Sequence, residues 1–211
     1  MKKLIPILLA VFAFASCEKD PDMGKLDDKY LVYTNYDKQA DFKVPTFYLA
    51  DQILVINDSK EPEYLEGEGA QQILAAYTEN MEARGYTPAP DKESADLGIQ
   101  VSYIASTYYF TTYNQPEWWW GYPGYWGPNY WGGNWGGGWY YPYPITYSYS
   151  TNSFLTEIVN LDAEQGETKK LPVIWTSYLT GYETGSKVIN RTLAVEAVNQ
   201  SFAQSPYLTN K

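Results

Sequence analysis

The stretch that decides the fold reads Leu97-Gly98-Ile99-Gln100-Val101-Ser102-Tyr103-Ile104-Ala105-Ser106. Its odd positions are apolar or aromatic, and its even positions are mostly small or polar. This period of two predicts a β-strand with one buried face. We expect the strand to run to about Tyr113. The rest of the chain must then supply partner strands and a layer that covers the buried face.

Four further segments have the composition of strands. Residues 30–36 are β-branched and aromatic, and residues 47–56 form a second apolar stretch. Residues 145–161 alternate again, although the charged residue Glu157 stands at one of the apolar positions. We expect a bulge near residues 151–153 to change the direction of the strand. Residues 171–179 follow a polar turn at 162–170, so the last two segments are predicted to form a hairpin.

Two segments have helical spacing instead. The first begins at Glu68 and ends at Gly85, and the second begins at Ser186 and is closed by Pro206. Their apolar stripes consist of Ile73, Leu74, Tyr77 and Met81 in the first and Val188, Val195, Val198 and Phe202 in the second. Because each helix is apolar on one side only, both are expected to pack against the sheet. The sequence therefore predicts one α+β domain at 30–211, with two layers: two helices on one face of a largely antiparallel sheet of about five strands.

The N-terminus has the features of a secretory leader. Lys2 and Lys3 precede a short apolar run, and small residues follow at Ala15 and Ser16. The run is too short to span a bilayer. Residues 1–16 are therefore predicted to be a signal peptide.

Cys17 follows these small residues directly. The run Phe14-Ala15-Ser16-Cys17 resembles the lipobox of bacterial lipoproteins, in which the cysteine is acylated and becomes the mature N-terminus. Phe14 stands where such boxes usually carry leucine, a departure tolerated in Bacteroidetes-type bacteria. The alternative is a plain signal peptide with a chance cysteine. Acyl chains on Cys17 would hold the protein at the membrane without embedding it.

Residues 17–29 are predicted to be a lipidated N-terminus and a solvated tether, because they are charge-rich and lack periodicity. Glu18-Lys19-Asp20 resembles the charged signal that sends some Bacteroidetes lipoproteins to the cell exterior, and a solvated linker is the alternative. The predicted location is the outer membrane, on its periplasmic or cell-surface side.

Residues 116–144 form a long loop rich in aromatic residues, glycine and proline. These 29 residues hold seven of the eight tryptophans. Three interpretations compete: rings packed as a satellite core on the sheet, rings that bind a glycan or an envelope protein, and rings inserted at the membrane interface. The segment has Glu117 and no lysine or arginine, which weakens the third. The candidate binding residues are Trp118, Trp119, Trp120, Tyr122, Tyr125, Trp126, Tyr130, Trp131, Trp135, Trp139, Tyr140 and Tyr141.

Composition excludes several kinds of chemistry. The chain has 15 Lys and Arg against 25 Asp and Glu, a net charge of −10, which disfavours nucleic-acid binding. It has no histidine, and Cys17 is its only cysteine. Triads that use histidine, metal sites built on histidine or cysteine, and disulfides are thus excluded. We expect no metal and no cofactor. Carboxylates are the available acid–base groups, and Asp96 and Glu157 are isolated in the sequence.

Several short motifs occur in a fixed order along the chain. They are Tyr36-Asp37, Ala40-Asp41-Phe42, Phe47-Tyr48, Arg84-Gly85-Tyr86, Ala95-Asp96-Leu97 before Val101-Ser102-Tyr103, and then Asp162, Gly166 and Trp175. Together they resemble the bacterial lipoprotein family called domain of unknown function 4136, from about Tyr30 to Pro206. Members of that family are similar in carrying a Gly, Tyr and Trp-rich stretch at this point. Thr176 stands where an arginine often follows the tryptophan.

The resemblance implies an envelope lipoprotein with two helices on a sheet, and it implies no activity, cofactor or catalytic residue. The function expected from the sequence is a non-catalytic binding or scaffolding module at the outer membrane. The alternative is a carboxylate-dependent enzyme that processes glycans.

Overall fold

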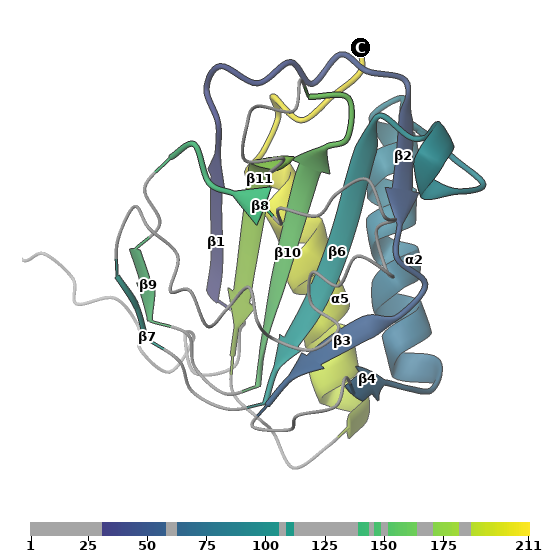
Figure 1. Ribbon diagram of the computed structural model, residues 1–211. Helices are drawn as coiled ribbons and strands as arrows, with labels where there is room; N and C mark the ends of the chain where they lie inside the picture. The colour runs from purple at the N-terminus through teal and green to yellow at the C-terminus, as the bar shows by residue number, and fades with distance from the viewer. Residues whose placement is uncertain are drawn as a thin grey trace, which may run out of the picture.

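The computed structural model (Figure 1) describes residues 31–57, 63–105, 109–111, 139–143, 146–148, 152–163, 171–181 and 187–211. In chain order the elements are β1 (Leu31–Tyr36), β2 (Thr46–Leu49), β3 (Ile53–Ile56), β4 (Glu63–Leu65), α2 (Glu68–Ala83), β5 (Thr87–Pro88), the 3-10 turn η1 (Lys92–Ser94), β6 (Leu97–Ile104), β7 (Tyr109–Thr111), β8 (Trp139–Tyr140), β9 (Thr146–Ser148), β10 (Ser153–Asn160), β11 (Leu171–Thr180) and α5 (Lys187–Ala203).

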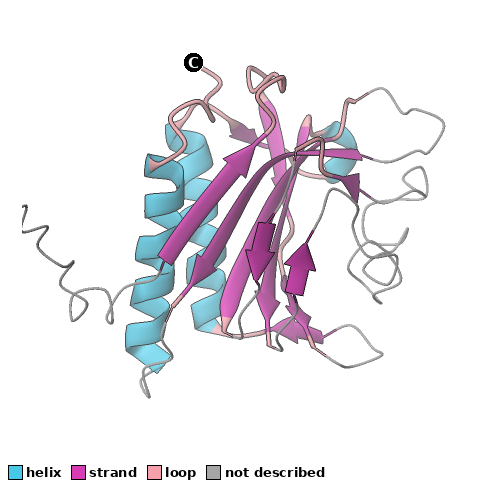
Figure 2. Ribbon diagram, turned by 90° about the vertical axis from the view of Figure 1, so that its left-hand side faces the viewer, coloured by secondary structure: helices cyan, strands magenta, loops and turns pink. Residues whose placement is uncertain are grey.

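The described residues form a two-layer α+β domain. Nine strands make one mixed sheet, whose main path runs β1-β11-β10-β6-β2-β5, while β7 and β9 form a separate pair. Figure 2 shows α2 and α5 together on one face of the sheet. The predicted class and the placement of both helices are confirmed. The sheet has more strands than the five expected.

The sheet combines antiparallel and parallel pairs. β1, β11, β10 and β6 pair antiparallel in that order, so the predicted hairpin of β10 and β11 is confirmed. The predicted strand at 47–56 is in fact two strands, β2 and β3, and each runs parallel to one half of β6. A parallel neighbour needs a crossover connection, and α2 provides it between β4 and β6.

The core between the helices and the sheet contains large aromatic side chains, and Trp175, Tyr77 and Phe202 are fully buried. The rings of Trp175 and Phe202 lie 5.5 Å apart. The indole N–H of Trp175 donates to Oγ of Ser205 at 2.9 Å, and the Thr156 hydroxyl donates to the Tyr77 hydroxyl. The polar atoms of the buried rings thus have partners, as buried polar groups require.

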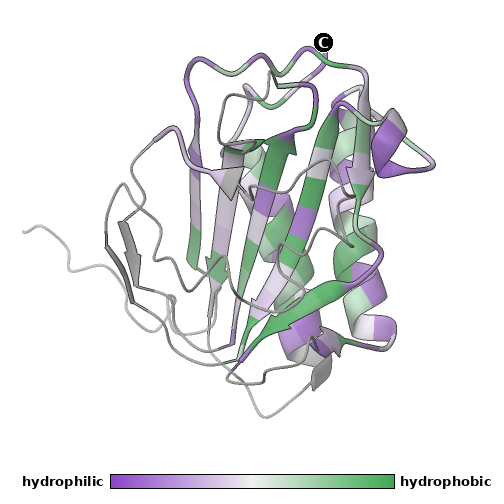
Figure 3. Ribbon diagram, in the orientation of Figure 1, coloured by the Kyte–Doolittle hydropathy of each residue, from purple (hydrophilic) through white to green (hydrophobic). Residues whose placement is uncertain are grey.

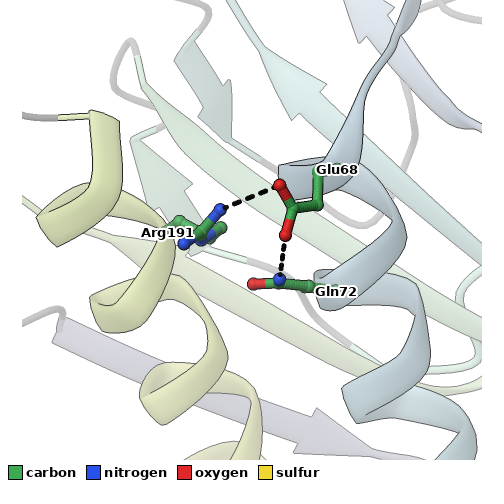
Figure 4. Close-up of polar contacts among 3 residues, drawn as sticks. All are labelled: Glu68, Gln72 and Arg191. Atoms are coloured by element: carbon green, nitrogen blue, oxygen red, sulfur yellow. Dashed lines mark hydrogen bonds and ion pairs between the residues drawn. The ribbon is translucent and has the colours of Figure 1, made fainter.

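The two helices also meet at the surface. Arg191 Nη1 lies 3.8 Å from Glu68 Oε2, and Glu68 Oε1 accepts a hydrogen bond from Gln72 Nε2 at 3.0 Å (Figure 4). Such an exposed ion pair stabilises a fold by no more than about 1 kcal/mol. The association of α2 with α5 therefore depends mainly on the buried rings beneath them.

The opposite face of the sheet, called the second face below, is also buried. The prediction that the strand from Leu97 has a single buried face is wrong, because Gln100 and Ser102 are as inaccessible as their apolar neighbours. A second cluster of buried residues covers this face: Leu54, Ile56, Ala95, Ile104, Leu155, Val159, Leu161, Leu171, Val173 and Tyr178. Figure 3 shows hydrophilic bands crossing the otherwise hydrophobic strands β6 and β10.

Two predicted strands are shorter than expected. β6 ends at Ile104 rather than near Tyr113, and β7 beyond it pairs with β9 instead of extending the main sheet. The segment 145–161 is likewise divided into β9 and β10. The bulge predicted near 151–153 is not found at the described residues there: Asn152, whose φ of 60° is left-handed, lies just before β10, and the register of β10 against β11 shifts instead between Ile158 and Val159. Each predicted strand is divided in two because its halves have different partners: β6 pairs with β10, whereas β7 pairs with β9.

The end of α2 is closed by Gly85, as the sequence predicts. Its φ is 93°, and the N–H of Tyr86 donates to the carbonyl of Met81 at 3.2 Å. The C-terminal residues of the chain add to this closure, since the N–H of Asn210 donates to the carbonyl of Arg84 at 3.1 Å. A glycine is needed here because a side chain strains a backbone with positive φ.

We expect Gly85→Ala to lower the free energy of unfolding by at least about 1 kcal/mol. Gly69→Ala is the matched control, because Gly69 is helical and an added Cβ there meets only Arg191 Cδ at 3.6 Å. This control should raise the free energy of unfolding by about 0.5 kcal/mol. Chemical denaturation measures both, and equal effects of the two substitutions would contradict the proposed role of Gly85.

Candidate functional site

The candidate binding residues divide into two groups. Trp139, Tyr140 and Tyr141 lie in the described part of the chain. The other nine lie outside the described residues, and so does Cys17; the nine are Trp118, Trp119, Trp120, Tyr122, Tyr125, Trp126, Tyr130, Trp131 and Trp135. The described residues thus hold the end of the aromatic segment, where the chain returns to the sheet.

This return is built into the sheet. β8 pairs in parallel with the start of β11, with Trp139 opposite Leu171 and Tyr140 opposite Pro172. Tyr143 is only 8% exposed, and its ring lies 5.9 Å from that of Tyr141 in an edge-to-face arrangement. Tyr141 packs against the buried cluster of the second face. The aromatic segment is therefore fixed to the fold at its C-terminal end.

Not every ring at this end is packed. Tyr140 is 43% exposed, whereas Tyr143, three residues later, is buried. The return of the segment thus combines a buried ring with one that is open to solvent.

The same face of the sheet holds a row of buried polar side chains. Gln100 of β6, Glu157 of β10 and Thr176 of β11 are directly opposite one another in the register and share the second face. All three are buried, as is Ser102. Within the part of the chain that the structure describes, the hydroxyl oxygens of Ser102 and Thr176 have no hydrogen-bond partner. Each such group costs about 1–3 kcal/mol, so the row is an expensive feature of the fold. Glu157 breaks the alternation of its strand, which is the one sign of this row in the sequence.

A second polar cluster joins β2, β6 and the end of β10. The Thr46 N–H donates to Asp96 Oδ2 at 2.8 Å, and the Thr46 hydroxyl donates to the same oxygen. The side chain of Asp162 is also hydrogen-bonded to Asp96. Asp96, which appeared isolated in the sequence, thus has a carboxyl partner 66 positions further along the chain.

The pKa values of the two carboxyl groups are shifted in opposite directions. Burial alone would raise the pKa of Asp96, but hydrogen bonds from Thr46 and Asp162 outweigh it, and the pKa lies below its usual value. The hydrogen bond to Asp96 raises the pKa of Asp162, and partial burial and the negative charge of Asp96 raise it further. Of the two carboxyl groups, Asp162 is therefore the one that is protonated more readily.

Neither carboxylate site has the geometry of a glycosidase. Those enzymes separate their two carboxyl groups by about 5–9.5 Å, whereas Asp96 and Asp162 are in direct hydrogen-bond contact. Glu157 pairs opposite Gln100, which lies four residues further along the chain than Asp96, or about 13 Å away.

Among the described residues, no group of three or more His, Cys, Asp or Glu side chains could hold a metal ion. No helix in this part of the chain is long and apolar enough to cross a membrane.

These features define a class: α+β domains with two helices on one face of a mixed sheet and an aromatic segment returning onto the other. Within that class, the chain belongs to the family described as "Domain of unknown function (DUF4136)", whose model matches residues 32–207. The resemblance noted in the sequence is thereby confirmed. The family description assigns no activity.

The chain is similar to a DUF4136 family protein from Bacteroides thetaiotaomicron VPI-5482, known from a crystal structure. The two are 84% identical, with a TM-score of 0.77, over 88% of this chain and 100% of that one. PelC from Paraburkholderia phytofirmans, described as a dodecamer, is 10% identical with a TM-score of 0.40, over 86% of this chain and 99% of that one. No curated protein matches the sequence.

The acid pair makes stability depend on pH. The favourable contribution of Asp96, whose pKa is lowered, is present above its unfolded pKa and is lost as the pH falls through its folded value. The contribution of Asp162, whose pKa is raised, is present below its unfolded pKa and is lost as the pH rises through its folded value. Asp162→Asn keeps a donor to Asp96 at every pH. We expect this substitution to raise the free energy of unfolding at pH 7 by about 1 kcal/mol or less, and so to raise Tm. The gain should be smaller at pH 4.

Thermal unfolding followed by circular dichroism at both pH values measures this difference. Glu82→Gln, an exposed substitution on α2, is the control and should leave Tm unchanged at either pH. An equal gain from Asp162→Asn at pH 4 and pH 7 would show that the two carboxyl groups are not hydrogen-bonded to each other.

Proposed function

We propose that this protein is an exported lipoprotein of the cell envelope, held at the outer membrane by an acylated Cys17. The leader at 1–16 and the lipobox-like run before Cys17 support this proposal. The 84% identity to a Bacteroides protein also supports it, since such bacteria accept loosely conforming lipoboxes. Cys17 precedes Leu31, the first residue of β1, by 14 residues, so the tether reaches about 50 Å at most. The domain would work close to the membrane surface.

We further propose that the domain is a non-catalytic binding or scaffolding module, with the aromatic segment 116–144 as its binding surface. The observation that carries this proposal is the return of the segment onto the second face, where β8 and Tyr143 fix it while Tyr140 stays exposed. Exposed rings on a fixed loop suit the apolar faces of sugar rings and the side chains of a protein partner. The expected ligand is therefore an envelope glycan or an envelope protein.

The arrangement of acidic groups favours binding over catalysis. The alternative of a glycan-processing enzyme needs two carboxyl groups placed on either side of a sugar linkage. Among the described residues, Asp96 and Asp162 are hydrogen-bonded to each other instead, and Glu157 is buried in the middle of the sheet. Sugar release that a single Asp or Glu substitution abolishes would restore the enzyme alternative.

Acylation is tested by labelling cells with a fatty-acid analogue. The wild-type protein should incorporate the label and sediment with outer membranes. Cys17→Ser should abolish labelling and release the protein from the membrane fraction, because no other cysteine can carry the acyl chains. Ser16→Ala keeps a small residue at the cleavage site and should be labelled normally. Label in the Cys17→Ser protein would refute the lipoprotein assignment.

Binding is tested by tryptophan fluorescence, because seven of the eight tryptophans lie in the aromatic segment. Sacculi or envelope polysaccharide from a Bacteroides strain should shift the emission of the wild-type protein. Tyr140→Ala should weaken the response several-fold without changing Tm, since Tyr140 is exposed. Tyr33→Ala is the matched control, because Tyr33 is similarly exposed, at 47%, but lies on β1. Emission that no envelope fraction or envelope protein changes would contradict the binding proposal.

A further inference from the structure

The outer edge of β2 is left open over a short stretch. The N–H of Ala50 donates to the carbonyl of Ile99 in β6 at 3.1 Å, whereas the carbonyl of Phe47 faces the other way and accepts from Ala89 at 2.8 Å. Because backbone groups alternate between the two edges of a strand, the N–H and C=O of Leu49 point outward like those of Phe47. β5 pairs only with Thr46 and Phe47, and within the described residues no strand pairs with Leu49 on that side.

The opening is bounded on both sides by strands that do pair. β5 covers the edge before it, and beyond it β4 covers β3 at Ile53–Val55. The sheet thus has room for a short added strand between β5 and β4. Open strand edges are the places where proteins accept strands from other chains.

A groove lies against this opening. It has a volume of about 310 Å³ and is lined by residues 47–51 of the β2 edge, Pro88 and Ala89, and Gln71, Leu74, Ala75 and Thr78 of α2. Figure 1 shows β2 and α2 side by side at this edge of the sheet. We call this feature the edge groove. Leu74 and Ala75 make its helix side apolar, and its volume suits a short segment of chain.

The opposite side of the edge groove is negatively charged. Tyr48 points to the second face, where it packs against the second cluster. Asp51 lines the groove itself, and Asp91 and Glu93 belong to the η1 turn, which contacts β2. Burial raises the pKa of Tyr48, and these three carboxylates raise it further. Lys92 lies in the same turn and offsets one of the three. The net charge of the surroundings favours a basic ligand.

We propose that the edge groove binds an extended, basic peptide segment of a partner protein, which adds to the sheet beside β2. The backbone of the segment would pair with the N–H and C=O of Leu49, as in other cases of strand addition. Successive side chains of a strand point to opposite faces. The segment would therefore place an apolar residue toward Leu74 and Ala75 and the next residue, a lysine or arginine, toward Asp51, Asp91 and Glu93.

This site is separate from the aromatic segment and from Cys17, so the inference does not rest on the proposed function. The probe is a fluorescent hexapeptide of alternating lysine and valine, added to the full chain and followed by fluorescence polarisation. We expect saturable binding that is at least tenfold weaker for a glutamate and valine peptide of the same length. A lysine and valine peptide with a central proline should also lose binding, because proline cannot donate to the strand ladder.

Two substitutions and a control locate the binding site. Ala75→Trp fills the groove from an exposed helical position and should weaken binding at least tenfold, and Asp51→Lys should do the same by reversing a charge. Glu82→Trp lies on α2 outside the groove and should bind like the wild type. If Ala75→Trp does not fold, Asp51→Lys still decides the matter.

Hydrogen exchange measured by NMR distinguishes strand addition from other modes of binding, because only a paired strand protects the backbone amide at the edge. The Leu49 amide should become protected when the lysine and valine peptide is added, while exposed amides on α5 should not change. Three results would each overturn the proposal: no binding at 1 mM peptide, unchanged affinity in both groove variants, or binding without protection of Leu49. The last would mean that the basic peptide is held only by the general negative charge of the protein.

Discussion

Every residue of β10 from Ser153 to Val159 is buried, and the rest of the structure depends on this constraint. Side chains of a strand alternate between the two faces of its sheet, so both faces must be covered. The helices cover Phe154 and Ile158 on one face. On the other, Leu155 and Val159 belong to the second cluster, against which Tyr141 packs. The aromatic segment is therefore tied to the core of the fold and not only to its surface.

The second face contains features that stability alone does not explain. A purely hydrophobic row at Gln100, Glu157 and Thr176 would avoid the cost of burying polar groups. Instead three central strands place polar side chains side by side, next to the buried hydroxyl of Ser102. This polar row and the return of the aromatic segment lie on the same face of the sheet.

The two halves of the sheet differ in how they can interact. The β1 half is antiparallel, begins at Leu31 and carries β8 with Tyr140. The β2 half is parallel, lies beside α2 and presents the edge groove with its acidic side. The return of the aromatic segment and the edge groove therefore lie on different halves of the sheet.

Local patterns in the sequence were enough to predict the helices and the hairpin, because their contacts follow directly from periodicity. The stripe from Ile73 to Met81 predicted α2, Gly85 predicted its end, and the alternation on both sides of residues 162–170 predicted the pairing of β10 with β11. The family resemblance also came from short motifs in their order along the chain, and the match over residues 32–207 confirmed it.

Only the tertiary structure decided how these pieces meet. Gln100 and Ser102 read as solvent-facing residues, because alternation does not show that a second layer will cover them. The division of residues 47–56 into β2 and β3 depends on which half of β6 each strand joins. The bonds between Thr46 and Asp96 span 50 residues, and the edge groove needs α2 beside β2. The sequence by itself determined the two helices, the hairpin of β10 and β11, and the exclusion of chemistry that needs histidine. Long-range packing determined the buried polar row, the acid pair and the open strand edge, because each joins residues that have no local pattern in common.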